Sequence, residues 1–589
     1  MANIADMTTT AFQRARLFGE RIRSHVLLIA VTAFLVFLIA VPLIRLVASS
    51  FQLGHPSIPE GWSLQNYTAA FSMGRFYSAL ATTVVVSAVG TFITMAIAIL
   101  FAWLIDRTDM PFRNLAWVLI LIPMAMPGIL FAMGWVLLLA PKTGALNIGI
   151  RGIFESIGIH FTEGPLNIYS YGGLIFLDGL RGVTTVFLMI VGAFRMMDPS
   201  LEEAARVSKA GARGTFFQIT LPVLMPAVLM AGMYSFISSM DSLEAPLAVG
   251  LPAGIFLLST LIYFTTRVQT PTDYGLGATF GVFYMILMIG LLILYRRAIG
   301  YSARFATVTG KGYRPRVNAL GKWRYLAVGM FVLYFLLTVV APFAILLWAS
   351  LLPSYRLPSW EAFKFISLLN YEDIFSDPHN LSVVWNTFLL VLLTATATML
   401  LAFMVSWVVV RSRVPGRSIL DGFLFLPHAI PGVVIALALM MAYLTYPLNQ
   451  LGIYGSIWLV VFGLIASYIA FGSRLMNSGI TQIHAELEEA AYMSRASVTR
   501  TLFSITLPLL FPVFAAGWVW VAVHALRAFS IPLMLSSKQN EVLAVSLWAY
   551  WDEGEASRAA ALGVLLMLFL IPLTLLMRRF IVRFSGRDS

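Results

Sequence analysis

Long apolar stretches constrain the fold of this chain more than any other feature. Twelve of them lie near residues 27–50, 79–105, 115–140, 171–196, 216–240, 275–298, 324–350, 383–410, 419–446, 455–478, 502–526 and 558–582. About 20 apolar residues in a helix cross the hydrocarbon layer of a bilayer. Backbone inside that layer must satisfy its own hydrogen bonds, as a helix does. The pattern therefore predicts an all-α integral membrane protein with 12 transmembrane helices in a lipid bilayer.

The distribution of charge supports this class and predicts an orientation. Only 11% of the residues are charged, whereas soluble domains average about a quarter. If the N-terminus is cytoplasmic, 28 of the 39 Lys and Arg residues fall in loops on the inner side. Positive residues favour that side of a membrane. We therefore expect both termini in the cytoplasm, and the net charge of +12 does not require a nucleic-acid partner.

The sequence repeats itself across its two halves. Residues 201–226 (LEEAARVSKAGARGTFFQITLPVLMP) and 487–512 (LEEAAYMSRASVTRTLFSITLPLLFP) are identical at 15 of 26 positions, at an offset of 286 residues. A second echo joins residues 101–128 to 405–432 at an offset of 304, sharing Trp103/Trp407 and Arg107/Arg411. Repeats of this kind are typical of transporters built from two similar halves.

Each half contains an even number of predicted spans, so both halves enter and leave the membrane on the same side. We predict a first half over residues 1–298, a basic cytoplasmic linker over 299–323 and a second half over 324–589. The fold expected is two parallel six-helix repeats, related by an axis along the membrane normal.

The repeated phrase lies between the fourth and fifth spans of each half, at about residues 198–226 and 484–512. In the first copy, Asp198 suits a helix N-cap and Pro199 suits the first helical position. Gly211 and Gly214 are expected to end this short helix before the next span begins. A connecting helix is one interpretation. Two copies at the same topological place favour a helix that docks into a partner.

These residues resemble the EAA loop of bacterial ABC importer permeases of type I. The resemblance implies that both loops couple to ATPase subunits, and it carries over to Leu201, Glu202, Glu203, Ala204, Ala205, Lys209, Leu221 and Pro222, and to Leu487, Glu488, Glu489, Ala490, Ala491, Arg495, Leu507 and Pro508. Lys209 and Arg495 stand where the family has glycine, which puts its tight bend in question. The resemblance also implies two cytoplasmic ABC ATPase subunits, a periplasmic substrate-binding protein and a location in the bacterial inner membrane.

A fused double permease looks most like the iron(III)-type importers. The stretches SMDSLEAPLAV (239–249) and ALRAFSIPLML (525–535) are similar to that group's unequal pair, with Glu before Pro in one half and Arg in the other. Related permeases for thiamine, sulfate, polyamines and aminophosphonates share much of this plan and remain alternatives.

Charged residues within or beside apolar segments are candidate pathway residues, because charge is costly there. Asp241 and Arg527 are equivalent by the 286 offset and opposite in sign. We hypothesise that Asp241 or Glu244 pairs with Arg527 at an outer gate. The alternative is that all three lie in water outside the span. Asp178 and Arg181, one turn apart, are expected to form an ion pair within their helix.

No chemistry of an enzyme is evident in the chain. No Gly-x-x-x-x-Gly-Lys-Ser/Thr phosphate loop occurs, so ATP hydrolysis is expected in a separate subunit. The histidines show no metal-binding spacing, so no metal or other cofactor is expected on this chain. A 12-span secondary transporter driven by an ion gradient is the alternative of another class, but it has no need of two docking loops.

Overall fold

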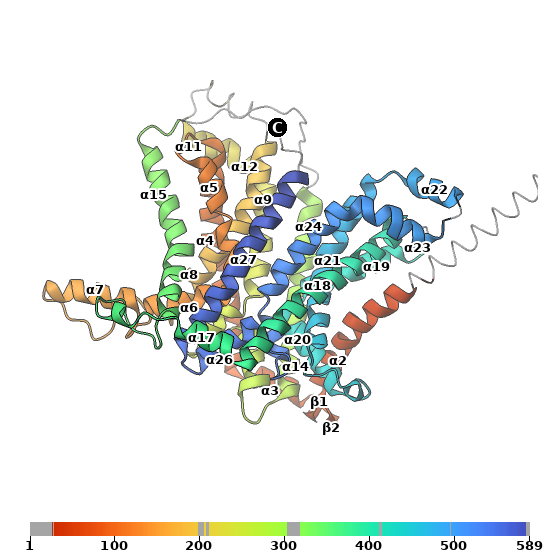
Figure 1. Ribbon diagram of the computed structural model, residues 1–589, viewed down its shortest axis with the longest axis horizontal. Helices are drawn as coiled ribbons and strands as arrows, with labels where there is room; N and C mark the ends of the chain where they lie inside the picture. Colours follow the sequence, from red (N-terminus) through yellow and green to blue (C-terminus); the bar gives the residue numbers. More distant parts are fainter. Residues whose placement is uncertain are drawn as a thin grey trace, which may run out of the picture. The chain divides into compact units, whose positions relative to one another are not determined.

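The computed structural model describes residues 26, 29–197, 205, 207, 211–302, 319–411, 415–494 and 496–584. Helices make up most of this part of the chain (Figure 1). Its only sheet is a small antiparallel pair, β1 (Gln52–His55) and β2 (Ile58–Trp62). The expectation of an all-α membrane protein is therefore met, apart from this hairpin.

Nine helices in the described residues are long and apolar enough to cross a membrane by themselves. They are Ile29–Ser50, Gly74–Arg107, Phe216–Met240, Tyr274–Ala298, Trp323–Ser350, Pro378–Arg411, Ile457–Gln482, Thr499–Leu526 and Ala556–Leu573. Three further pairs of helices qualify only if each bent pair is one span. The predicted number of 12 spans is therefore the upper count.

The helices and short helical turns referred to below run as follows. They are α2 (Val41–Ser50), α4 (Gly74–Arg107), α5 (Arg113–Leu119), η2 (Ile122–Ala125), α6 (Gly128–Leu139), α8 (Tyr171–Arg181), α9 (Val183–Met196), η3 (Phe216–Thr220), α12 (Leu221–Met240), α13 (Leu258–Tyr263), α14 (Tyr274–Ser302), α16 (Ala341–Ser350), α18 (Pro378–Arg411), α19 (Arg417–Leu424), η9 (Pro427–Ala429), α20 (Gly432–Leu444), α21 (Ile457–Gln482), α22 (Ala485–Met493), α23 (Val498–Thr501), η11 (Leu502–Thr506), α24 (Leu507–Leu526), α25 (Ser530–Leu535), α26 (Leu543–Asp552) and α27 (Ala556–Phe584).

The third predicted span of each half is broken at a proline pair. The chain turns by 94° between η2 and α6, and by 106° between η9 and α20. Pro127 and Pro431 stand at the breaks as the N-caps of α6 and α20, both with extended ψ angles. Proline disfavours helical backbone in the residue before it and lacks an N–H donor. Pro123 and Pro127 of the first half recur as Pro427 and Pro431 in the second, which explains why the same break occurs twice.

The fourth spans of the two halves differ. α8 and α9 are bent by 42° relative to each other at Gly182, whereas α21 is continuous over the matching stretch. A Cβ at Gly182 would lie 2.9 Å from Thr94 Cγ2 of α4, so only glycine allows this close approach.

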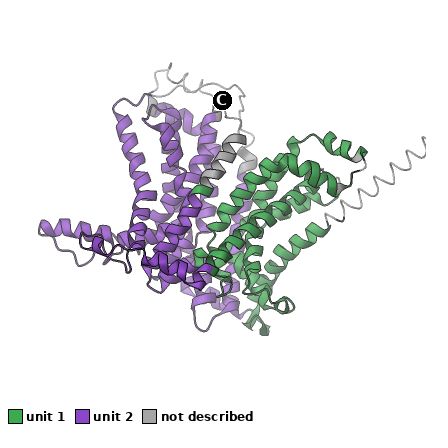
Figure 2. Ribbon diagram, viewed as in Figure 1, with its two compact units in different colours: residues 1–64, 382–545, 572–589 green, residues 65–381, 546–571 purple. Residues whose placement is uncertain are grey.

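Two compact units make up the chain, and they do not follow the order of the halves (Figure 2). Unit 1 comprises residues 1–64, 382–545 and 572–589, and unit 2 comprises 65–381 and 546–571. Within unit 1, α2 packs on α20, and within unit 2, α16 packs on α6. The first span of each half thus packs against the body of the other half. The predicted boundaries of the two halves describe the sequence repeat, and they stay a prediction.

Local features recur at equivalent positions in the two units. The N–H of Leu258, at the start of α13, donates to Thr83 Oγ1 of α4 at 2.9 Å. The N–H of Leu543, at the start of α26, donates to Thr387 Oγ1 of α18 at the same distance. The first N–H groups of a helix lack partners within the helix. In both units a threonine of a neighbouring span supplies one.

Candidate functional site

The second copy of the repeated phrase folds into a short exposed helix, α22, followed by α23 and the span α24. On α22 the residues Glu486, Glu489, Ala490 and Met493 are exposed. Their spacing of i, i+3, i+4 and i+7 places them on one face of a helix. The second copy therefore forms a short helix before the span, as the repeat predicts. Figure 1 shows α22 and α23 at the same end of the helices as α19.

Glu488 lies on the opposite face of α22 and is buried, with 5% of its surface exposed. Its carboxylate accepts hydrogen bonds from Trp407 Nε1 at 3.3 Å and from Thr506 Oγ1 at 3.2 Å. Arg411 Nε lies 3.5 Å from Glu488 Oε1, within ion-pair distance. A buried charge is tolerated when it is paired and hydrogen-bonded, and Glu488 has both kinds of partner.

Arg411 connects this cluster to a third helix. It is the last residue of α18, and its Nη2 donates to the carbonyl oxygens of Ile480, at 3.0 Å, and Ile483. These carbonyls lie at the C-terminal end of α21, where a helix leaves carbonyl groups without internal partners. A basic side chain is the natural partner there. One guanidinium therefore joins the ends of α18, α21 and α22.

The first copy is described only in part. The predicted coupling residues Leu201, Glu202, Glu203, Ala204 and Lys209 lie outside the described residues, as does the predicted helix start at Asp198. Ala205 is buried and Val207 is 85% exposed. The residues 286 positions later, Ala491 and Met493, are buried and 76% exposed. The exposure of the two described positions of this segment thus matches that of their counterparts in the second copy.

The anchoring arginine of α18 also has a counterpart. Arg107, the last residue of α4, is buried, and its Nη2 donates to the carbonyl oxygen of Phe194 near the end of α9. Arg107 and Arg411 differ by 304 residues, and Phe194 and Ile480 by 286, the two offsets of the repeat. In both halves, therefore, an arginine at the end of one span donates to a carbonyl oxygen near the end of the fourth span.

The helix α22 ends close to the position where Arg495 replaces the family's glycine. Arg495 itself lies outside the described residues, but α22 ends at Met493 and α23 begins at Val498. The N–H of Ala496 donates to the carbonyl of Ala491 at 3.0 Å and closes the helix end. The second copy therefore has a break between two helices in this stretch.

The two Leu-Pro pairs, Leu221-Pro222 and Leu507-Pro508, form the first turns of α12 and α24. In each half a five-residue π-helical segment, η3 or η11, comes directly before the pair. Proline has no N–H to donate to the preceding turn, and a π-bulge is one way to accommodate an interrupted hydrogen-bond ladder. The Leu-Pro pair therefore marks where the connecting segment joins the span.

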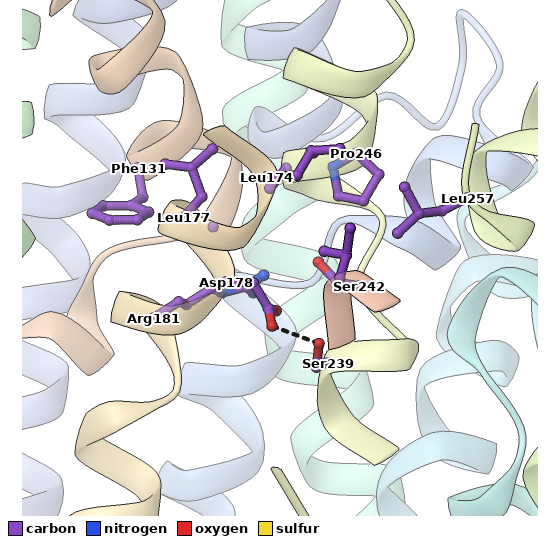
Figure 3. Close-up of a pocket in the computed structure, with 12 residues that line it drawn as sticks. Phe131, Leu174, Leu177, Asp178, Arg181, Ser239, Ser242, Pro246 and Leu257 are labelled. Carbon is purple, nitrogen blue, oxygen red and sulfur yellow. Dashed lines mark hydrogen bonds between the residues drawn. The ribbon is translucent and has the colours of Figure 1, made fainter. Parts of the chain in front are cut away.

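A second cluster of charge lies inside unit 2, around a small cavity (Figure 3). Arg181, the last residue of α8, makes a bidentate pair with Glu244, with N–O distances of 2.7 and 3.2 Å. Asp178 accepts a hydrogen bond from Ser239 Oγ at 2.6 Å. Asp178 and Arg181 attract each other electrostatically, as expected, but their hydrogen bonds do not join them to each other. Each of them instead bonds to a residue at or just beyond the end of α12, because that helix end faces α8.

Two glycines make room for this cluster. A Cβ at Gly90 of α4 would lie 2.1 Å from Asp178 Oδ2, and one at Gly128 of α6 would lie 2.4 Å from Arg181 Cζ. The cluster is not repeated in the second half. By the 286 offset, Leu464, Ser467, Ala525 and Ser530 stand at the positions of Asp178, Arg181, Ser239 and Glu244.

The predicted gate residues lie at the ends of the fifth spans. Asp241 is the C-cap of α12, and Arg527 is the C-cap of α24. Glu244 binds Arg181 within unit 2. Arg527 belongs to unit 1, so its pairing with Asp241 or Glu244 stays a prediction.

Trp407, Arg411 and Thr506 were not among the predicted coupling residues. Trp407 and Arg411 lie about 80 residues before the repeated phrase, and the span α21 separates them from it. The sequence nevertheless pointed to two of them, because the similarity between residues 101–128 and 405–432 includes this Trp and Arg in both halves. Among the described residues, no group of three or more His, Asp or Glu side chains is arranged to hold a metal ion.

Comparison with known proteins identifies the class of transporter. Residues 398–586 match the family described as the binding-protein-dependent transport system inner membrane component. This match covers α22, the Glu488 cluster and Leu507-Pro508. Over these residues the chain carries the domain of ABC importer permeases.

Relatives resemble the permease over most of its length. The ferric transport system permease protein FbpB of Actinobacillus pleuropneumoniae is 24% identical over 583 residues, which cover 98% of the permease and 81% of that protein. The Fe(3+)-transport system permease protein FbpB 2 of Haemophilus influenzae is 22% identical, over 68% of the permease and 74% of that protein.

Shorter relatives and solved structures match part of the chain. The sulfoquinovosyl glycerol transport system permease protein SmoG of Agrobacterium fabrum is 28% identical, over 48% of the permease and 91% of that protein. A chain of a bacterial alginate ABC transporter, solved with a periplasmic protein bound to alginate pentasaccharide, is 19% identical. It covers 44% of the permease and 94% of its own length, with a TM-score of 0.35.

Proposed function

We propose that this permease forms the translocation pathway of an ATP-driven importer and receives the force of ATP hydrolysis through its two repeated loops. The observation that carries the proposal is the exposed face of α22, formed by Glu486, Glu489, Ala490 and Met493. A helix that projects a small, partly acidic face fits a groove on a partner. Glu488 and Ala491 hold its other face in the protein.

The partners follow from this role. Two cytoplasmic ATPase subunits dock on the two loops, and hydrolysis of ATP takes place on those subunits with no cofactor bound by the permease. A periplasmic binding protein delivers substrate on the opposite side of the inner membrane, and both termini are cytoplasmic. Closure of the ATPases moves the two loops together and switches the spans from an inward-open to an outward-open arrangement.

The substrate proposed is of the ferric type. Its support is the name of the ferric permease relatives, which match 98% and 68% of the chain. On this proposal Asp241, Glu244 and Arg527 form the gate at the outer ends of the fifth spans. Thiamine, polyamines, sulfate and aminophosphonates are the competing substrates. Ligand bound to the purified partner binding protein, identified by mass spectrometry and metal analysis, decides among them.

The coupling role is tested by reversing charge on both loops. In Glu203→Lys combined with Glu489→Lys, we expect normal insertion into the membrane, loss of the co-purifying ATPase and loss of uptake. Glu361→Lys with Glu372→Lys is the matched control, because it changes net charge equally at exposed residues on the predicted outer side. This control is expected to retain the ATPase.

Two results would contradict the proposal. Wild-type uptake by the double Lys variant would exclude docking through these glutamates. Uptake by the wild-type permease that needs no ATPase and stops when the ion gradient is collapsed would identify an ion-coupled secondary transporter instead.

A further inference from the structure

The two adjacent glutamates of the repeated phrase lie on different faces of the helix. Glu489 is on the exposed face of α22, whereas Glu488 is 5% exposed and surrounded by its partners. Successive residues of a helix are separated by about 100°, so one of a pair can face a partner protein while the other faces the span bundle. The phrase therefore contains two acids with different tasks.

The partners of Glu488 belong to the ends of long, rigid elements. Trp407 and Arg411 lie in the last two turns of α18, a helix of 34 residues. Thr506, fully buried, ends η11 and precedes α24. Arg411 in turn binds carbonyls at the end of α21. A displacement of α22 must either carry these three spans with it or break a buried, charged cluster.

We propose that Glu488 is a positioning residue that fixes α22 to the ends of α18, α21 and α24, so that a force applied to the exposed face moves these spans. This inference rests on the proposed function, because it requires that an ATPase docks on that face. Glu489 makes the contact with the partner, and Glu488 transmits the movement.

The first half carries the same parts wherever it is described. Trp103 and Arg107 stand 304 residues before Trp407 and Arg411, and Thr220 stands 286 before Thr506. Arg107 and Thr220 are both buried, at 1% exposure each. By the same offset Glu202 is the positioning glutamate of this half and Glu203 the docking glutamate.

The test compares the same substitution at the two neighbouring glutamates, in the permease reconstituted with its co-purifying ATPase and its binding protein. For Glu488→Gln we expect the ATPase to remain bound and to hydrolyse ATP, while substrate imported per ATP falls by about 5- to 150-fold, the usual span of a coupling between sites. For Glu489→Gln we expect the ATPase itself to be lost. Asp421→Asn is the control, because it breaks a pair with Arg474 in the same unit without touching α22.

A second measurement is independent of any ATPase. The chain has no cysteine, so spin labels can be attached at Met493→Cys and Ile419→Cys, both exposed positions of unit 1. We expect a narrow distance distribution between them in the otherwise wild-type protein and a broad one in Glu488→Gln. If Glu488→Gln does not fold, Trp407→Phe removes one hydrogen-bond donor and serves as the milder variant.

Each outcome decides between the two ideas. Transport per ATP at the wild-type level in Glu488→Gln, or loss of the ATPase as in Glu489→Gln, overturns the positioning role. A spin-label distribution unchanged by Glu488→Gln also overturns it. If the wild-type permease binds no ATPase, the proposed function fails, and the spin labels still report whether Glu488 holds α22.

Discussion

Gly128 is the position where one added methyl group should disturb the charged cluster of unit 2. Gly128 begins α6, and a Cβ built there would lie 2.4 Å from Cζ of Arg181, 2.6 Å from Nη2 and 2.7 Å from Nη1. All three contacts are guanidinium atoms. In Gly128→Ala the guanidinium must therefore move, and its bidentate pair with Glu244 must lengthen or break.

The structure sets bounds on the free energy of unfolding that this substitution costs. Forcing one methyl group into a packed site costs about 1–3 kcal/mol. Removing one partner of a buried ion pair costs about 3–5 kcal/mol, which is the upper limit here because neither charge is removed. At a helical glycine with free space, alanine instead stabilises by about 0.4–1 kcal/mol. Gly192 of α9 is such a position, with no atom within 4 Å of a built Cβ. The two substitutions are thus expected to have opposite signs.

The assay is unfolding of the purified permease in mixed micelles of increasing SDS content, followed by tryptophan fluorescence. A double-mutant cycle with Arg181→Ala then tests the cause. If the cost of Gly128→Ala arises from the guanidinium, it should vanish in the Arg181→Ala background, because contacting residues show non-additive effects. An equal cost in both backgrounds, or a stabilisation like that of Gly192→Ala, would refute the reasoning.

Three further predictions concern other residues. Gly90→Ala should destabilise the protein by about 1–3 kcal/mol in the same assay, because its Cβ would lie 2.1 Å from Asp178 Oδ2. The cost of Gly90→Ala should be no smaller in a Ser239→Ala background, because the carboxylate of Asp178 is still present. Thr387→Val should cost about 1–3 kcal/mol by leaving the buried N–H of Leu543 without its acceptor, and Thr83→Val should cost the same through Leu258. Asp241→Arg and Arg527→Asp should each abolish uptake, and their combination should restore it; failure of the restoration would count against the predicted gate pair.

Much of the fold was predictable because the membrane leaves few alternatives. Apolar stretches of sufficient length must be helices there, and nearly every predicted segment is a helix or a bent pair of helices. Pro127 and Pro431 marked the broken spans, since proline interrupts a helix in any environment. The exchange of first spans between the compact units was not predictable. It depends on which apolar face packs against which, and these faces look alike in the sequence.

The candidate site was predictable in position but not in its contacts. The repeated phrase indicated where α22 lies and that it is exposed. It did not reveal which of Glu488 and Glu489 is buried, because the rotation of a short helix is set by partners from distant segments. Those partners, Trp407 and Arg411, belong to a different echo at a different offset. The bidentate partner of Arg181, Glu244, was missed for a similar reason: it lies 63 residues away in sequence, whereas the nearest acid, Asp178, accepts its hydrogen bond from Ser239.

The pattern of what is duplicated and what is not supports a division of labour in the permease. The Trp and Arg that end α4 and α18, the paired glutamates and the buried threonine occur in both halves. The charged cluster of Arg181 and Glu244 occurs in one half only.

The second half has a different feature at the corresponding level of its fifth span. The ring of Trp520 stacks between Phe471, at 3.6 Å, and His524, at 3.7 Å. Tyr234, Thr185 and Ser238 occupy the equivalent positions of the first half, so this stack is not repeated either. Under the proposed function, two ATPases that act alike require two equal attachment points, which accounts for the similarity of the two copies of the phrase. A single substrate crossing a single pathway would impose no such equality, which is consistent with a charged cluster in one half and an aromatic stack in the other.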